Sequence, residues 1–297
     1  LEELIKKELL TKEECEACDW GGSESYVDYE KIYLSRYKLL RKAYEKADLK
    51  TDPDYAEFLK EEKDWLQDYC LFMAIKNDQK GICWIDWPEE LKDRHSKAVK
   101  EAEKELAEEI EFYRFQQYCF TTQWRKLKAY ANKKDISIIG DVPIYVALDS
   151  SDAWANPEML QFDEDYDPKA VAGCPPDAFS ATGQLWGNPL YDWKALKKDG
   201  YGWWVQRMTH CLELYDVVRI DHFRGFDEYY AIPYGDKTAE RGKWEKGPGM
   251  DLFHTLDKKI KDLRVIAEDL GFLTESVLEM LKESGYPGMK VLQFAFD

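Results

Sequence analysis

The sequence lacks any apolar run long enough to span a bilayer or to act as a signal peptide. It also lacks an excess of basic residues, because 42 Lys and Arg stand against 59 Asp and Glu, a formal net charge of −17. Without surplus cations to neutralise phosphates, nucleic acids and anionic membranes are excluded as natural partners. At 297 residues, the chain is long enough for one large domain or two ordinary ones.

Nucleotide-binding motifs are absent as well. No expected strand leads into a G-x-G-x-x-G turn or a P-loop, so the sequence does not support a nucleotide site. Seven scattered cysteines, an odd number, indicate reduced thiols and a cytoplasmic protein. Cys15 and Cys18 form a lone C-x-x-C with no second pair or histidine nearby, and we predict no metal site.

Aromatic residues, by contrast, are abundant: 11 Trp, 19 Tyr and 13 Phe. Many must be buried, since aromatic rings carry large apolar areas. Aromatic rings also stack on the apolar faces of sugars, and several here lie in loops rich in Gly, Pro and Asn. Their placement gives a first indication of a carbohydrate ligand.

Residues 1–133 are charged and have helical periodicity, which predicts a helical subdomain. Tyr33, Tyr37, Leu40 and Tyr44 form one apolar stripe on a helix expected over 29–46. Asp52-Pro53 is a favourable helix start, followed by one apolar face with Phe58, Trp65, Tyr69 and Phe72. A further helix is expected from about Ser96 to Asn132. We interpret these stripes as packing faces.

After residue 133, short apolar runs typical of strands alternate with helical stretches. The runs lie at Ile136–Ile139, Val217–Ile220, Val265–Ala267 and Val291–Phe296, and the helices after the first run lie at about 200–215, 251–263 and 275–284. This alternation predicts a parallel sheet covered by helices. Asp141, Asp221 and Glu268 each follow one of the first three runs, and ligands bind at the carboxyl ends of parallel strands. The three acids therefore predict a converging site.

Arg219 and Asp221 lie two residues apart, so their side chains point to the same side of the expected strand. A cation this close favours the ionised carboxylate. Taken alone, the pair is more typical of a structural ion pair at a strand end than of a functional site. The other two strand-end acids favour the functional interpretation.

We expect residues 134–297 to be part of a (β/α)₈ TIM barrel. Such barrels take about 250 residues, and this region supplies only about four strand–helix units. Half a barrel would expose unpaired strand edges. We therefore expect the chain to belong to a longer protein.

Several stretches occur in a fixed order along the chain: Ile138–Ala147, Asp149–Asn156, Gly173–Ser180, Thr182–Tyr191, Val217–Phe226 and Ala267–Gly271. Together with Phe115–Phe120 and Gln123-Trp124, they resemble the amylomaltase or 4-α-glucanotransferase family of the α-amylase clan. The resemblance implies retaining transfer between α-1,4-glucans or maltooligosaccharides, a glycosyltransferase reaction that needs neither an organic cofactor nor a metal.

The resemblance also implies individual roles. Asp221 would be the nucleophile that forms a covalent glucosyl intermediate, and Glu268 the general acid and base. Arg219 would keep Asp221 ionised. The residues implied to contact substrate are Asp141, His222, Asp177, Phe179, Trp186 and Asn188. Asn188-Pro189 as a simple turn, and Trp186 as a core residue, remain alternatives.

Two departures from the family pattern matter. Ala178 stands where the family usually has a tyrosine. The family's third catalytic carboxylate and its first two barrel strands are expected to lie outside this chain. An α-glucan hydrolase of the same clan, or an inactive glucan-binding fragment, therefore remain alternatives to the transferase.

Overall fold

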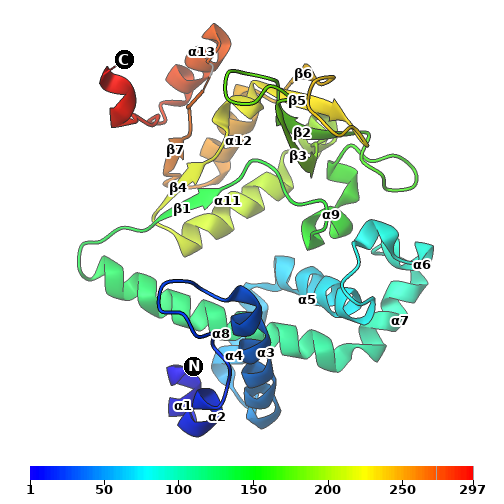
Figure 1. The fold of residues 1–297 in the computed structure, drawn as a ribbon, viewed down its shortest axis with the longest axis vertical. Helices are drawn as coiled ribbons and strands as arrows, with labels where there is room; N and C mark the ends of the chain where they lie inside the picture. Colours follow the sequence, from blue (N-terminus) through cyan, green and yellow to red (C-terminus); the bar gives the residue numbers. More distant parts are fainter. Residues whose placement is uncertain (272, 297) are drawn as a thin grey trace. The chain divides into compact units, whose positions relative to one another are not determined.

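A computed structural model describes residues 1–271 and 273–296 (Figure 1). The chain divides into two compact units. The first, called here the helical unit, comprises Leu1–Gly81 and His95–Gln123. The second, the mixed unit, comprises Ile82–Arg94 and Trp124–Asp297. The predicted division into a helical subdomain over 1–133 and a partial catalytic barrel over 134–297 stays a prediction.

The helical unit consists of helices joined by short connections. In chain order they are α1 (Glu2–Lys6), α2 (Lys12–Glu16), α3 (Tyr29–Lys46), α4 (Pro53–Glu61), α5 (Lys63–Asp78), α7 (Lys97–Glu105) and the first part of α8 (Ala107–Asn132). Apolar residues of α1, α2, α3 and α8 meet in a cluster that includes Leu4, Cys15, Leu39 and Phe112.

The predicted helix over 29–46 is confirmed as α3, which begins where the Asp28 carboxylate accepts the Lys31 amide. Its buried residues include Leu39 and Ala43, whereas Tyr33, placed on the apolar stripe by the prediction, is 56% exposed. The periodicity therefore predicted the helix correctly. It placed the buried face a fraction of a turn away from the face that is buried in the structure.

The predicted helix start at Asp52-Pro53 is also confirmed, because the Asp52 carboxylate accepts two amides of the first turn of α4. The single helix expected from Ser96 to Asn132 is wrong. Ser96 does cap a helix, but α7 ends at Glu105 and a separate helix, α8, begins at Ala107. A break of this kind leaves the spacing of apolar residues almost unchanged, so periodicity does not reveal it.

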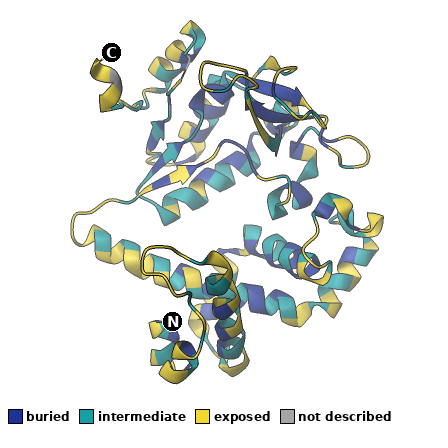
Figure 2. Cartoon of the chain, in the orientation of Figure 1, coloured by how far each residue is buried: buried dark blue, intermediate teal, exposed yellow. Residues whose placement is uncertain are grey.

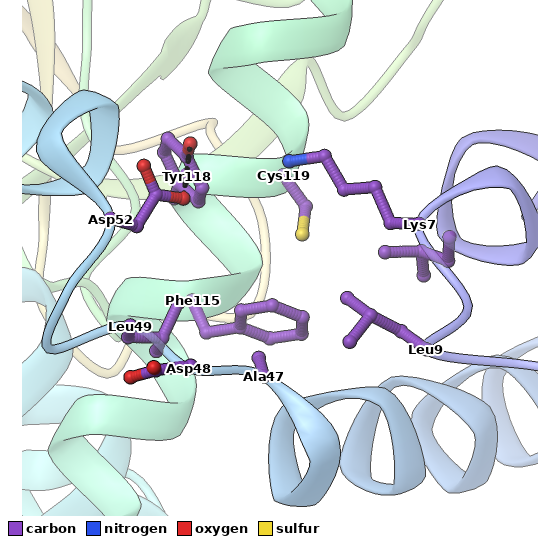
Figure 3. Close-up of a pocket in the computed structure, with 10 residues that line it drawn as sticks. Lys7, Leu9, Ala47, Asp48, Leu49, Asp52, Phe115, Tyr118 and Cys119 are labelled. Carbon is purple, nitrogen blue, oxygen red and sulfur yellow. Dashed lines mark hydrogen bonds between the residues drawn. The ribbon is translucent and has the colours of Figure 1, made fainter.

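A pocket of about 300 Å³ lies in the helical unit (Figure 3). One side is apolar and includes Leu9 and Phe115. On another side the Tyr118 hydroxyl donates to Asp52 at 3.0 Å, and the Lys7 ammonium lies 5.6 Å from the centre of the Tyr118 ring. The hydrogen bond joins α8 to the residue that caps α4.

The mixed unit contains two sheets. Its elements are η1 (Trp84–Asp86), α6 (Glu89–Lys92), the rest of α8, β1 (Ile139–Val142), α9 (Ser151–Ala155), η2 (Pro157–Met159), β2 (Ala170–Cys174), β3 (Gln184–Pro189), α10 (Trp193–Lys198), α11 (Gly202–Leu214), β4 (Val217–Ile220), η3 (Phe223–Phe226), β5 (Glu228–Pro233), β6 (Lys243–Lys246), α12 (Met250–Lys259), β7 (Val265–Ala267), α13 (Glu275–Ser284) and η4 (Leu292–Phe296).

The first sheet is parallel, in the order β1-β4-β7, and α11 packs on β1 and β4. Val218 and Ile220 on β4 are fully buried, while Arg219 between them is partly exposed. This alternation is the period-two pattern predicted for the strand. The loop that leads into β1 is exposed and is yellow in Figure 2. The α/β character predicted from the sequence is confirmed.

The second sheet is antiparallel, in the order β3-β2-β5-β6, and was not predicted. Its strands are poor in β-branched residues, as the sequences A-V-A-G-C, Q-L-W-G-N-P and K-W-E-K of β2, β3 and β6 show. Intrinsic strand preference is therefore weak here, and pairing between distant segments forms the sheet.

Two predicted strands differ in the structure. The run Ile136–Ile139 is shifted, because β1 covers Ile139–Val142, Ile136 is 58% exposed, and Asp141 lies within the strand instead of after it. The run Val291–Phe296 is not a strand, since residues 292–296 form η4. A short apolar run fits either structure by periodicity. Among the described residues, no helix has both the length and the apolar character that a membrane crossing needs.

Candidate active site

The parallel sheet places acidic and basic side chains on neighbouring strands. Asp141 on β1 is in register with Arg219 on β4. Arg219 Nη1 donates to Asp141 Oδ1 at 2.6 Å, and its Nη2 lies 3.0 Å from Asp221 Oδ1. The side chains of Asp141 and Asp221 remain 62% and 43% exposed, whereas that of Arg219 is 24% exposed. One partly buried guanidinium therefore holds two solvent-facing carboxylates.

Backbone hydrogen bonds continue beyond the strand ends and fix the residues that follow. The Asp221 amide donates to the Val142 carbonyl at 2.9 Å, and the Glu268 amide donates to the Ile220 carbonyl at 3.0 Å. Asp221 and Glu268 are thus held at the ends of adjacent strands, as the strand-end prediction requires.

The Glu268 side chain is oriented by backbone amides. Its Oε2 accepts the His222 amide at 2.9 Å, and its Oε1 accepts the Leu270 amide at 2.8 Å. Each carboxylate oxygen has more than one lone pair, so both retain acceptor capacity. The carboxyl group is therefore held in a fixed orientation.

His222 follows Asp221 with a left-handed backbone (φ 53°), a conformation that favours glycine and asparagine over most other residues. Its Nε2 is buried and has no hydrogen-bond partner among residues 1–271 and 273–296. Burial, assisted by the charge of Arg224, lowers the pKa of His222 from 6.5 to about 4. The imidazole is therefore neutral at pH 7 and offers hydrogen bonds without charge.

Trp186 on β3 lies against His222, with ring centres 4.9 Å apart at 85°. Trp186 is 37% exposed, and its indole Nε1 donates to Gln184 at 3.0 Å. The alternative that Trp186 is a core residue is wrong, because a substantial part of its surface faces solvent.

The remaining predicted contacts lie in the same unit. Asp177 Oδ1 accepts the amides of Phe179 and Ser180, both at 2.8 Å, which folds the loop before β3 into a turn. Phe179 is 98% exposed. Asn188 Nδ2 donates to the Val146 carbonyl at 2.8 Å. The described contacts link Trp186 and His222 to the carboxylates but do not link Asp177, Phe179 or Asn188 to them.

The sequence interpretation overlooked an acidic loop of D-x-D-x-D pattern at residues 163–167. Asp163 Oδ1 accepts the amides of Asp165 and Asp167 at 2.9 and 3.0 Å. Pro168 stands where a calcium-binding EF-hand loop requires glycine. The Asp163 side chain therefore closes the loop by accepting two of its backbone amides, and the sequence pattern departs from that of a calcium-binding EF-hand.

An arginine paired with carboxylates at the carboxyl ends of parallel strands defines an α/β protein with a carboxylate-based candidate active site. A family model described as 4-alpha-glucanotransferase matches residues 1–297. The chain belongs to the 4-alpha-glucanotransferase family, and the resemblance stated from its motifs is confirmed.

Individual relatives agree. The 4-alpha-glucanotransferase of Clostridium butyricum is 50% identical over 297 residues, which are 100% of this chain and 61% of the relative. That of Streptococcus pneumoniae (strain TIGR4) is 47% identical, over 100% of this chain and 59% of the relative. This chain therefore spans about three fifths of the length of these relatives.

Solved structures extend the comparison. The amylomaltase from Streptococcus agalactiae in complex with acarbose matches with a TM-score of 0.94 and 38% identity, over 99% of this chain and 60% of that one. The amylomaltase from Corynebacterium glutamicum, 20% identical, matches with a TM-score of 0.71 over 90% of this chain and 36% of that one. The second match shows a shared fold.

Proposed function

We propose that the complete protein transfers α-1,4-glucan segments between maltooligosaccharides and retains the anomeric configuration. Family membership supports this reaction, and a structurally similar amylomaltase binds acarbose. The observation that carries the proposal is the Arg219–Asp221 pair at the end of β4, with Glu268 held at the end of the adjacent strand.

In the proposed mechanism, a carboxylate oxygen of Asp221 attacks the anomeric carbon of the donor glucan. The bond from that carbon to the leaving oxygen breaks, and Glu268 gives the leaving oxygen its proton. The 4-hydroxyl of an acceptor then attacks the same carbon, Glu268 takes the hydroxyl proton, and Asp221 leaves as a carboxylate. Retaining chemistry of this kind uses carboxyl groups roughly 5–5.5 Å apart.

The proposed sugar contacts divide by chemistry. Asp141 and His222 would bind glucose hydroxyls, and the exposed surface of Trp186 would stack on a pyranose ring. Phe179 and Asp177 would belong to a loop that covers the substrate, since Phe179 is almost fully exposed. Asn188 would offer its amide oxygen, because its nitrogen is bonded to the Val146 carbonyl.

We also propose the finer architecture, in which residues 134–297 form part of a (β/α)₈ barrel and residues 1–133 a helical subdomain before it. The three parallel strands and their flanking helices fit this arrangement. A crystal structure of the complete protein in which these strands belong to an open sheet would contradict it. The predicted cytoplasmic location can be tested by cell fractionation.

Incubation of the complete protein with maltotriose tests the reaction. A transferase produces glucose together with oligomers longer than maltotriose, whereas a hydrolase produces glucose and maltose without longer products. The two outcomes differ in whether sugar or water attacks the intermediate. A wild-type protein that yields no longer oligomers would contradict the proposal.

Variants test the proposed roles. Asp221→Asn removes the nucleophile and should lower kcat by at least about 10⁴-fold, while Glu268→Gln should lower it by about 10²–10⁴-fold. Asp165→Asn is the matched control, because Asp165 is an exposed acid on a loop of the same unit. Activity retained in Asp221→Asn would rule out its role as nucleophile.

A further inference from the structure

The guanidinium of Arg219 makes a third contact that the proposed reaction does not by itself explain. Nη1 and Nη2 are directed to Asp141 and Asp221, and Nε donates to the thioether sulfur of Met289 at 3.1 Å. Every nitrogen of the guanidinium therefore has a partner. Because the guanidinium is planar and rigid, contacts on both edges fix its plane as well as its position.

Met289 is in turn fixed to the end of β7. The Ala267 amide donates to the Pro287 carbonyl at 2.9 Å, and the Met289 amide donates to Asp269 Oδ1 at 2.7 Å. Asp269 is only 6% exposed and directly follows Glu268 in the sequence. The segment 287–289 is thus joined to the strand end on both sides of Glu268.

Gly288 makes this close approach possible. A Cβ atom at position 288 would lie 2.3 Å from Asp269 Oδ2. The neighbouring carboxylate has little freedom to move away, since it is buried and bonded to the next amide of the same segment. The segment therefore fits against Asp269 only with glycine at this position.

The chemistry of the sulfur suits its place beside the carboxylates. A thioether is a weak, neutral acceptor, so it orients the Nε–H bond without competing for the charge of the guanidinium. A carboxylate at that position would compete with Asp221 for the cation. An aliphatic side chain would leave the Nε–H bond of a partly buried guanidinium without this acceptor.

We propose that Met289 and Asp269 are positioning residues for the nucleophile. Asp269 fixes the backbone of Met289, the thioether fixes the guanidinium of Arg219, and Arg219 then holds Asp221 in line with the anomeric carbon. The proposal rests on the proposed function, and it adds two residues that act through Arg219 without touching substrate.

Met289→Leu in the complete protein is the central test, because leucine keeps an apolar side chain of similar volume and removes the acceptor. Met280→Leu is the matched control: Met280 is a buried methionine on α13, in the same unit. Met289→Gln offers a carbonyl oxygen at similar reach and should restore part of any loss. Asp269→Asn keeps an acceptor for the Met289 amide and should be milder than Asp269→Leu.

The first readout is the covalent step alone, measured with 5-fluoro-α-glucosyl fluoride. Asp221 attacks the anomeric carbon, the carbon–fluorine bond breaks, and the released fluoride is counted with an electrode. We expect Met289→Leu to lower this rate and kcat on the order of 10-fold, within the ~10²-fold that a 1 Å misplacement costs. KM and the thermal unfolding midpoint should change little, and Met280→Leu should match wild type.

The second readout does not depend on activity. Nitrogen-15 NMR follows solvent exchange of the Arg219 Nε–H proton, which should be faster in Met289→Leu and slower again in Met289→Gln. Wild-type rates of trapping and exchange in Met289→Leu, or an equal loss in Met280→Leu, would overturn the proposal. A wild-type protein that makes no longer oligomers but shows the expected exchange pattern would instead contradict the proposed function.

Discussion

Replacing His222 by asparagine should make the protein less sensitive to acid. The substitution removes the titrating group, and asparagine tolerates the left-handed backbone of this position. Burial first, and then the charge of Arg224, lowers the pKa of His222 from 6.5 to about 4 in the folded protein. Comparing wild type with His222→Asn therefore measures the effect of the titration without adding backbone strain.

The direction and size of the effect on stability follow from the difference between the folded and unfolded pKa values of His222. A depressed folded-state pKa means that below pH 6.5 the unfolded chain binds a proton that the folded protein does not bind until about pH 4. The contribution of His222 to stability is therefore complete above pH 6.5 and declines as the pH falls to about 4. At 1.36 kcal/mol per pKa unit, the full loss is about 3 kcal/mol, and most of it is reached at pH 4.5.

Two measurements check this. The chain has 4 histidines, so proton NMR can follow each imidazole, and His222 is the signal missing from His222→Asn. Urea unfolding at pH 7 and pH 4.5 should show a loss in wild type that exceeds the loss in His222→Asn by roughly 2–3 kcal/mol. The carboxylates titrate in both proteins, so their contribution cancels when the two losses of stability are compared. A His222 midpoint near 6.5, or equal losses in both proteins, would refute the reasoning.

Three further perturbations have definite outcomes. A Cβ on Gly140 would lie 1.9 Å from the Tyr215 ring, so Gly140→Ala should cost about 1–3 kcal/mol in urea unfolding, and an unchanged midpoint would contradict the close packing. Asp52→Ala removes the cap of α4 and the hydrogen-bond partner of Tyr118, which should cost about 1–3 kcal/mol in urea unfolding. A loss of only about a few tenths of a kcal/mol would mean that solvent replaces both contacts. Burial raises the pKa of Cys70 to about 12, so iodoacetamide at pH 8 should label it only after urea is added, and mass spectrometry showing prompt native labelling would exclude this.

Much of the candidate site was predictable because it depends on short-range geometry. The two-residue period of a strand placed Arg219 and Asp221 on one side, and the ion pair at 3.0 Å agrees with that placement. The alternation of helices and apolar runs predicted parallel strands, whose carboxyl ends coincide by topology. Asp141 differed in detail, since it lies within β1 and reaches the site by pairing in register with Arg219.

Other features were not predictable, for a common physical reason. Met289 contacts Arg219 from 70 positions away in the sequence, and no sequence motif marks a methionine as a hydrogen-bond acceptor. The antiparallel sheet depends on pairing of β2 with both β3 and β5, and β2 and β3 are poor in β-branched residues. Contacts of this kind are decided by tertiary packing, so periodicity and motif spacing contain little information about them.

The two carboxyl groups proposed to catalyse transfer are held by different kinds of partner. Asp221 is paired with a guanidinium that stays charged at any physiological pH. Glu268 accepts hydrogen bonds from two backbone amides, which orient its oxygens. The proposed mechanism likewise gives the two groups different tasks, since Asp221 attacks the anomeric carbon and Glu268 gives and takes a proton.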